Sequence, residues 1–587
     1  MSSRSSFCGG DDRLAPYNRR MNSLWLSVSL VICLGFALTP AYSQSMGYDE
    51  TADLDILAGL ANTRMHYQRL SSPLRPKAAI WEGLENEIDA LLSGTNDYAR
   101  LEALVHEKSA SELQAFVAEG ALSYEQITRY FIARIYTIET DDARYLNAVI
   151  ALNPSALEAA KLADRERNEG KAVAQDSLFG LPILLKDNIG FESLPTTAGA
   201  AALAENFAAD AFVTQRLKAN GVVILGKANL SEWAYFFCTG CPSGYSALGG
   251  QTLNPYGRLK FTTGGSSAGS GAAIAGGFAV AAVGSETSGS ILSPSSANSL
   301  VGLKPTTGSL SRSGVVPISS TLDTTGPMAR TVRDTVALFN AMTGYDQADT
   351  AMPRLTEDLT LLVRDADLSG LRLGFPTALA LEPLIVAAVA KLEAAGAIIV
   401  PVEFTPPDLE EEVQFMGAEM VRDLASYLQH YASPDVVIES LSDLQTFNLA
   451  APDERAPYGQ ALVDQMVGFE TFFKSDAQAG EGEITRLEQV VVGEVGGYLD
   501  GLFSRHNLDA LVRINNSGAS AGAFANYPAL TIPAGYRETG QPVGVTFYAP
   551  SFQEQRLIDI GMKLEEAGAL RRPPPKYLQG RIPHKQK

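Results

Sequence analysis

The feature that most limits the possible folds is a joint, found twice, in which an amphipathic helical stretch ends at a glycine before a short apolar run. Residues 214–221 lead in this way into 222–225, and residues 389–396 lead into 397–400. Glycine suits the left-handed position that commonly ends a helix, and a short apolar run bounded by turns is typical of a buried strand. Beyond Phe179 the alternation predicts an α/β fold with helices layered on a sheet.

The earlier part of the chain differs, because its apolar residues recur mainly with helical spacing. Residues 44–105 are rich in Leu, Ala, Glu and Arg, as in the stretch 81–92. From 109 to 139 apolar residues recur at intervals of three and four with a break at Gly120, which predicts two packed helices. We therefore expect a helical N-terminal extension over 44–105 and a main domain over 106–587.

The composition is that of an acidic globular protein. The 587 residues are 46% hydrophobic and 19% charged, so the chain can bury a large core and disorder is not expected. Against 46 Lys and Arg residues stand 66 Asp and Glu residues, which gives a formal net charge of -20 at pH 7. Such a charge repels a phosphate backbone and anionic lipid alike, which argues against nucleic acid as a partner.

The N-terminus has the order of features found in secretory signal peptides. Arg19 and Arg20 precede an apolar run over 24–38, and small residues follow over 39–43. The run is shorter than the roughly 20 apolar residues that span a bilayer, so a removed signal peptide over 1–43 is favoured over an uncleaved anchor. We expect a periplasmic or secreted protein with no stable membrane span after signal removal.

Cleavage near residue 43 leaves two cysteines, Cys238 and Cys241. In an oxidising compartment a short-loop disulfide suits this pair, and two unpaired thiols in a loop fit the spacing equally well. A structural zinc site needs two further ligands, which no nearby Cys or His supplies.

Three short segments combine polar residues with apolar or glycine-rich surroundings. The apolar stretch 181–185 leads into Lys186, and residues 264–270 and 284–290 are rich in Gly and Ser. Desolvation at the end of a buried strand disfavours an ammonium ion, so Lys186 can act as a neutral base. A glycine-rich turn before Ser290 lets backbone N–H groups converge on a developing oxyanion. Each segment taken alone also has a structural explanation: Lys186 as a strand-end lysine, the segment 264–270 as a turn, and Ser290 as a helix cap.

A competing pattern overlaps the second segment. Residues 265–269 satisfy the Gly-x-Ser-x-Gly nucleophile elbow of α/β-hydrolases, with Ser267 as the nucleophile. That motif requires a strand immediately before it, and residues 260–264 form no clear apolar run. Acidic and histidine partners in the expected order are not identifiable either, so the sequence disfavours the elbow.

These segments and others resemble the amidase signature family from about Ser109 to Pro573. The resemblance implies one large α/β domain with a mixed twisted β-sheet covered by helices on both faces. Within the family, the segments 152–186, 229–233, 250–255 and 571–574 look closest to bacterial peptide amidases. The matching motifs are long and specific, and they comprise residues 180–188, 226–233, 264–270, 301–306, 322–330, 527–535 and 540–544.

The family's triad of a lysine, a serine in a cis peptide and a nucleophilic serine maps onto Lys186, Ser266 and Ser290. Ser290 follows Ser266 by 24 residues, the family's usual separation, which selects Ser266 over Ser267. In the implied mechanism neutral Lys186 takes a proton through the Ser266 hydroxyl as Ser290 attacks an amide carbonyl, and the relay then protonates the departing amine. Water hydrolyses the acyl-enzyme, and no metal or organic cofactor is required.

The resemblance also implies an oxyanion hole made by the backbone N–H groups of Thr287, Ser288, Gly289 and Ser290. Two positions depart from the family pattern: Ser288 stands where Gly or Asp is usual, and Ser299 stands where Gly is usual. Because residue 288 contributes its backbone, we expect the first departure to adjust the oxyanion hole without removing it.

The implied substrate is the C-terminal amide of a peptide or another small amide. Two alternatives stay open: hydrolysis of fatty-acid or aryl acylamides, and a catalytically inactive secreted binding protein of the same fold. The aromatic stretch 233–237 offers Trp233 and Phe236 as substrate-binding residues, although core packing is the more frequent role of such residues.

Overall fold

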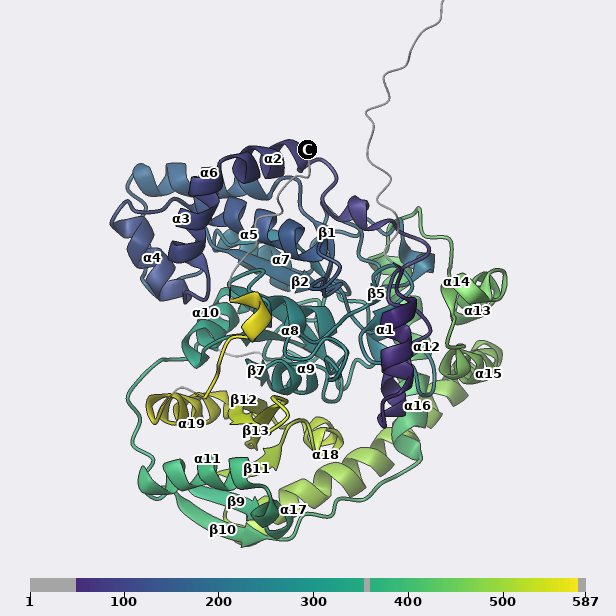
Figure 1. Cartoon of the computed structure of the whole chain (residues 1–587). Coiled ribbons are helices and arrows are strands. Elements are labelled where there is room, and N and C mark those ends of the chain that lie inside the picture. The colour runs from purple at the N-terminus through teal and green to yellow at the C-terminus, as the bar shows by residue number, and fades with distance from the viewer. Residues whose placement is uncertain (1–48, 353–358, 569, 579–587) are drawn as a thin grey trace, which may run out of the picture. The chain divides into compact units, whose positions relative to one another are not determined.

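The computed structural model describes residues 49–352, 359–568 and 570–578, so the expected signal peptide over 1–43 lies outside the described residues. The described chain contains an eleven-stranded mixed sheet flanked by helices (Figure 1), which confirms the predicted α/β class. In sheet order its strands are β1 (Val149–Leu152), β3 (Val223–Ala228), β2 (Pro182–Lys186), β6 (Ala281–Glu286), β8 (Thr324–Ala329), β7 (Val301–Lys304), β12 (Ala529–Tyr536), β13 (Pro542–Tyr548), β11 (Ala510–Ile514), β9 (Arg372–Pro376) and β10 (Ile398–Val402).

Strands β4 (Tyr245–Ser246) and β5 (Gly250–Gln251) form a separate small hairpin. The α-helices are α1 (Thr51–Ala58), α2 (Glu85–Ser93), α3 (Thr95–Val105), α4 (Ala110–Ala118), α5 (Tyr124–Glu139), α6 (Ala156–Asn168), α7 (Phe212–Ala219), α8 (Ala268–Ala275), α9 (Leu292–Ala297), α10 (Val332–Met342), α11 (Pro383–Ala394), α12 (Glu411–His430), α13 (Leu441–Leu449), α14 (Pro452–Arg455), α15 (Ala461–Ser475), α16 (Ala477–Val491), α17 (Gly497–His506), α18 (Ala519–Phe524) and α19 (Glu554–Glu566).

Strands β2, β3 and β6 form a parallel group at which the polar segments of the sequence meet. Strand β2 pairs in parallel with β3 on one side and with β6 on the other, and every residue of the three strands is buried. Parallel strands place their carboxyl ends at one edge of a sheet, where ligand sites of α/β folds commonly lie. Lys186 at the end of β2 and the turn after Glu286 at the end of β6 therefore emerge side by side.

Both helix-to-strand joints predicted from the sequence are present, between α7 and β3 and between α11 and β10. Gly221 and Gly396 have positive φ angles of 70° and 101°, the region that glycine occupies without strain. The second strand differs from the prediction in its environment. Because β10 is the last strand of the sheet, Ile398 is 45% exposed and not buried.

The two helices predicted over 109–139 are α4 and α5, and they are separated near Gly120, as expected. Each begins with a capping box. The Ser109 hydroxyl accepts from the Glu112 N–H, and the Ser123 hydroxyl accepts from the Gln126 N–H. Such caps satisfy backbone donors that a helix leaves unpaired, and each stabilises its helix by about 1 kcal/mol.

A helical layer, α12 to α17, is inserted in the chain between β10 and β11. Helices α12, α13 and α15 share an apolar cluster with a loop that follows β3, in which Met420 and Leu424 pack with Trp233 and Phe236. This layer brings one face of α12 close to the edge of the sheet where β2 and β6 end.

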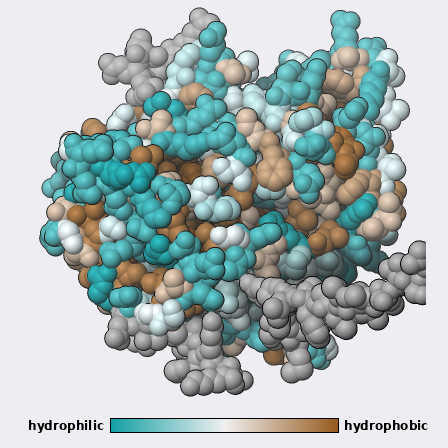
Figure 2. Space-filling model, turned by 90° about the horizontal axis from the view of Figure 1, so that it is seen from above, coloured by the Kyte–Doolittle hydropathy of each residue, from teal (hydrophilic) through white to brown (hydrophobic). Residues whose placement is uncertain are grey.

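Within the described ranges, no helix combines the length and the hydropathy needed to cross a bilayer. Figure 2 shows one face of the molecule, on which hydrophobic residues are interspersed among hydrophilic ones. Large exposed apolar side chains such as Ile56, Leu162 and Leu381 belong to different elements.

The predicted N-terminal helical region is confirmed in the described residues 49–105, and it shares the main apolar core. Leu57, Leu70 and Tyr98 are each at most 1% exposed in the same cluster as the central strands. This region is therefore an integral part of the folded unit.

We expect Leu57→Ala to lower the free energy of unfolding by about 2–4 kcal/mol, because it removes a fully buried side chain from the core. Denaturant unfolding measures the change. Its neighbour Ile56 is 53% exposed in the same helix, so Ile56→Ala should cost less than about 0.5 kcal/mol. Equal values for the two variants would mean that α1 does not pack as described.

Candidate active site

Lys186 lies fully buried at the end of β2. Its Nζ donates to Ser266 Oγ at 2.7 Å and to Ser285 Oγ at 2.9 Å, and it also contacts the Ser285 carbonyl at 3.1 Å. The Asn188 side chain donates to the same Ser285 hydroxyl at 3.0 Å. These hydrogen bonds thus direct the amine, which lies at the end of an otherwise apolar strand, toward two serine hydroxyls.

Ser266 lies in the loop before α8, and the peptide bond between Gly265 and Ser266 is cis. Its carbonyl accepts from the Ser231 N–H at 3.0 Å. The preceding glycines leave no room for side chains: a Cβ on Gly265 would lie 2.3 Å from the Ser243 hydroxyl, and one on Gly264 would lie 2.7 Å from the Ser293 backbone. These close approaches explain why the loop requires two glycines before the serine.

Ser290 lies in the turn after β6, beside the loop that carries Ser266. The Ser290 carbonyl accepts from the Ser267 N–H at 3.2 Å, which ties the turn to the residue directly after Ser266. Ser290 is 8% exposed, whereas Lys186 and Ser266 are 0% exposed. The structure therefore joins Lys186 and Ser266 by a side-chain hydrogen bond and brings Ser290 to the same loop through the backbone.

A buried carboxylate shapes the turn that carries Ser290. Glu286 accepts from the backbone N–H groups of Gly289, Ile291 and Leu292 at 2.7, 2.6 and 3.0 Å. Burial raises the pKa of Glu286, and these three hydrogen bonds oppose that shift. One carboxyl group thus fixes the backbone on both sides of Ser290.

This arrangement corrects one expected role. The Gly289 N–H, expected from the sequence to belong to the oxyanion hole, already donates to the Glu286 carboxyl group. No acceptor in the described part of the chain takes the N–H groups of Thr287, Ser288 or Ser290. Three of the four expected donors therefore remain available to a ligand.

The electrostatics of Lys186 favour a neutral amine. Burial lowers the pKa of Lys186 to about 7, although the nearby Asp323 and Glu286 carboxyls act in the opposite direction. At neutral pH a large fraction of the side chain is therefore unprotonated and able to accept a proton.

A cavity of about 180 Å³ opens beside this network. Asn188, Ser285 and Thr287 contribute to its wall, so it borders the hydroxyl that Lys186 contacts. Most of the remaining lining comes from the loop over 312–325, from residues 348–350 and from α12. A cavity next to a buried amine and to a turn with free N–H groups is a candidate site for part of a small organic substrate.

The two aromatic residues suggested for substrate binding do not line this cavity. Trp233 is 1% exposed and Phe236 is 8% exposed, and both pack in the apolar cluster with α12 and α15. Ala234, between them, lines the cavity instead. Packing outweighs binding here because the large rings fill the contact between the loop after β3 and the helical layer, so the assignment of Trp233 and Phe236 is corrected to a core role.

The competing nucleophile elbow does not form. Residues 260–264 are not a strand, and the Ser267 hydroxyl is fully buried, where it donates to the Ser285 carbonyl at 3.1 Å. Ser267 thus supports the end of β6 and has no access to a substrate.

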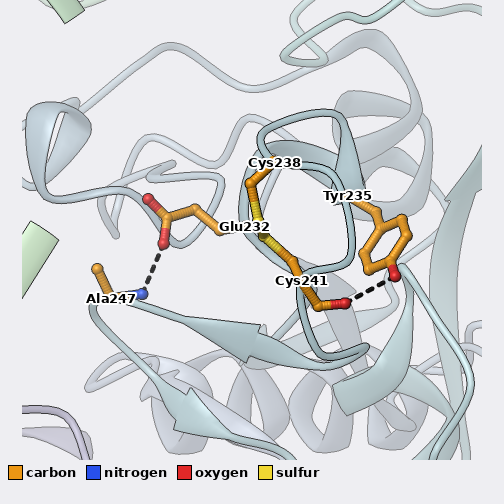
Figure 3. Close-up of a disulfide and its surroundings, with 5 residues drawn as sticks. All are labelled: Glu232, Tyr235, Cys238, Cys241 and Ala247. Atoms are coloured by element: carbon orange, nitrogen blue, oxygen red, sulfur yellow. Dashed lines mark hydrogen bonds between the residues drawn. A yellow bond between two sulfur atoms is a disulfide. The ribbon is translucent and has the colours of Figure 1, made fainter. Parts of the chain in front are cut away.

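The alternative left open for the two cysteines is resolved by the structure, in which Cys238 and Cys241 form a disulfide (Figure 3). Tyr235 donates from its hydroxyl to the Cys241 carbonyl at 2.7 Å within the same loop. The cross-link closes a short loop next to the segment that contributes Ala234 to the cavity.

Sequence reasoning missed several residues that shape the site. Glu286 and Ser285 end an apolar strand directly before the glycine-rich turn, the same signal that identified Lys186 at the end of β2. Asp323 accepts from the Thr287 hydroxyl at 2.5 Å, and burial raises its pKa to about 6. Its position within the motif over 322–330 was visible, but its partner 36 residues away was not.

Comparison with known proteins identifies the class of this fold and site. The amidase family model matches residues 126–488, which include β2, the cis serine, the turn after β6 and most of the helical layer. The chain therefore belongs to the amidase signature family and is an amide-hydrolysing enzyme.

Particular relatives include the peptide amidase of Stenotrophomonas maltophilia, whose crystal structure is 37% identical with a TM-score of 0.72 over 80% of this chain and 98% of that one. A probable amidase of Arabidopsis thaliana is 35% identical over 80% of this chain and 92% of its own length. A glutamyl-tRNA(Gln) amidotransferase component from a Sulfurihydrogenibium species is 30% identical over 78% of this chain and 96% of its own length.

We expect Glu286→Gln to lower kcat about 10- to 100-fold with a smaller effect on KM, because the turn holds donors needed mainly in the transition state. Glutamine offers one acceptor oxygen where glutamate offers two. Its NH₂ group would face a backbone N–H that donates to the carboxylate in the wild type. Steady-state rates of amide hydrolysis at constant pH measure the change.

The matched control is Glu232→Gln, because Glu232 is also buried but accepts one hydrogen bond, from the Ala247 N–H at 2.8 Å (Figure 3). Burial raises the pKa of Glu232 to about 8, so its predominant neutral form resembles glutamine. Nearly unchanged kcat is expected for this variant. A similar loss in both variants would show that buried glutamates act only through stability.

The pH dependence should report the amine of Lys186. Because its pKa is about 7 and the expected base is the neutral amine, kcat/KM should rise as pH increases from about 6 to about 8. A plateau that already begins near pH 5 would assign the base to another group. Kinetics in buffers of constant ionic strength separate this titration from salt effects.

Proposed function

We propose that this protein is an exported hydrolase that removes ammonia from peptide C-terminal amides through Ser290, Ser266 and Lys186. The observation that carries the proposal is the hydrogen bond of 2.7 Å between a fully buried Lys186 amine and the Ser266 hydroxyl, beside the turn of Ser290. Similarity to the peptide amidase of Stenotrophomonas maltophilia supports the substrate class.

In the proposed reaction neutral Lys186 accepts the proton of Ser266, which takes the proton of Ser290 as the Ser290 oxygen attacks the carboxamide carbon. The N–H groups of Thr287, Ser288 and Ser290 stabilise the negative oxygen of the tetrahedral intermediate. The proton returns through the relay to the nitrogen, ammonia leaves, and an acyl-enzyme remains. Water then attacks the ester, with the same amine as base, and releases the carboxylic acid.

Export has two independent supports. The sequence over 1–43 has the features of a signal peptide, and Cys238 and Cys241 are disulfide-bonded. Disulfides persist in oxidising compartments and are rare in the reducing cytosol. A periplasmic or secreted location is therefore part of the proposal.

The decisive experiment is ammonia release from N-acetylated dipeptide amides by the full-length protein and by Ser290→Ala. We expect the variant to lose at least about 1,000-fold in kcat while it retains the circular dichroism spectrum of the wild type. Hydroxylamine should trap the acyl group of the wild type as a hydroxamate.

Ser267→Ala serves as the matched serine variant, since Ser267 lies in the adjoining loop without access to substrate. It should lose far less activity than Ser290→Ala. Activity that survives Ser290→Ala would refute the assigned nucleophile. Turnover of fatty or aryl acylamides without turnover of peptide amides would keep the chemistry and replace the substrate class.

A further inference from the structure

The wall of the cavity beside Lys186 contains more carboxylates than cationic groups. Its charged lining residues are Arg312, Asp323, Asp349 and Asp423. Three carboxylates and one guanidinium group thus face the space that would hold the part of a substrate beyond the scissile carboxamide.

The single arginine is already neutralised. Arg312 Nε donates to Asp349 at 2.9 Å, its Nη2 donates to the other oxygen of the same carboxylate, and its Nη1 donates to the Ser320 carbonyl. A bidentate pair of this kind leaves little positive potential for a ligand. Arg312 also interacts electrostatically with Asp323 and Asp423, so its one positive charge is shared among three carboxylates.

The surroundings of Asp423 extend the negative region. Its oxygens accept from the Ser320 N–H at 2.6 Å and from Arg422 Nε at 2.7 Å. The same arginine also pairs with Glu419 at 2.7 Å and with Glu481 at 3.5 Å, so one cation is shared by three carboxylates. Around this wall, carboxylates outnumber guanidinium groups by five to two.

Aromatic rings complete the same wall. Tyr427 and Tyr431 of the α12 region line the cavity, and their rings are stacked with centroids 6.0 Å apart and an interplanar angle of 20°. Carboxylates combined with aromatic faces are the groups that bind organic cations, because the ring faces carry negative electrostatic potential.

This wall is also coupled to the reacting groups. Thr287 lies in the turn that carries Ser290, lines the cavity, and donates from its hydroxyl to Asp323. A substrate group that occupies the acidic wall would therefore be positioned relative to the proposed oxyanion donors.

We propose that the cavity selects amides that carry an organic cation, an ammonium or guanidinium group, on the portion that enters this acidic and aromatic wall. The inference rests on the proposed function, because it assigns a substrate class to the same site. Selection acts through carboxylates of the loop over 312–325 and of α12, which take no part in the proposed proton relay.

The test compares N-acetylated dipeptide amides that contain arginine or citrulline, its uncharged near-isostere, at either residue. We expect kcat/KM to be about tenfold higher for the arginine peptide at the preferred position, at low ionic strength. The ratio should fall as salt is added, because ions screen the attraction.

Variants locate the effect. Asp423→Asn should lower the arginine-to-citrulline ratio several-fold, and Asp349→Asn, which leaves Arg312 without its carboxylate partner, should lower it further. Asp453→Asn removes the same charge from an exposed position in α14 outside the cavity and should leave the ratio unchanged.

Binding to Ser290→Ala by calorimetry separates this inference from the proposed function. If Ser290→Ala binds the arginine peptide preferentially, this supports charge selection even where no turnover is observed. If the wild type shows no turnover, this counts against the proposed function alone. Equal affinities and equal kcat/KM values for the two peptides, or a ratio unchanged by Asp423→Asn and Asp349→Asn, would overturn the charge selection.

Discussion

The chemistry proposed for this protein depends on the burial of one lysine at the end of a strand. Exposed lysine is protonated at neutral pH and is no base, so the apolar neighbours of β2 are as important as the amine itself. Because β2 is paired on both sides, Lys186 is fully buried, and its amine is hydrogen-bonded to the hydroxyl groups of Ser266 and Ser285. The sheet therefore both lowers the pKa of the amine and directs it.

The second requirement is a backbone turn with free N–H groups. A buried carboxylate, and not regular secondary structure, accepts the other N–H groups of this turn. Glu286 takes three backbone donors that a glycine-rich turn would otherwise leave unpaired. By doing so it fixes which N–H groups remain for a substrate. The cost of burying this carboxyl is offset by those hydrogen bonds, and the same turn is held from the cavity side by the contact of Thr287 with Asp323.

Short sequence patterns predicted much of the fold and part of the site. The helix, glycine and strand joints and the strand leading to Lys186 follow from periodicity and glycine placement, which act over a few residues. Exposure of Ile398 did not follow, because it depends on strand order, which no short pattern encodes. Similarly, Trp233 and Phe236 gave the signal of a binding pocket, but residues about 180 to 230 positions later in the chain cover them.

Fold and family also explain why chemistry and selectivity can vary separately in this protein. The proposed reacting groups come from β2, β6 and the adjoining loops, whose positions are fixed by strand pairing and by glycines that tolerate no side chain. The acidic and aromatic wall comes from α12 and the loop over 312–325, which meet the sheet edge only through packing and side-chain contacts. A change of charge at Asp423 therefore alters what the cavity attracts without moving Lys186, whereas a change at Gly265 displaces Ser266 itself. Selection on substrate can thus act on the helical layer while the strand ends preserve the reaction.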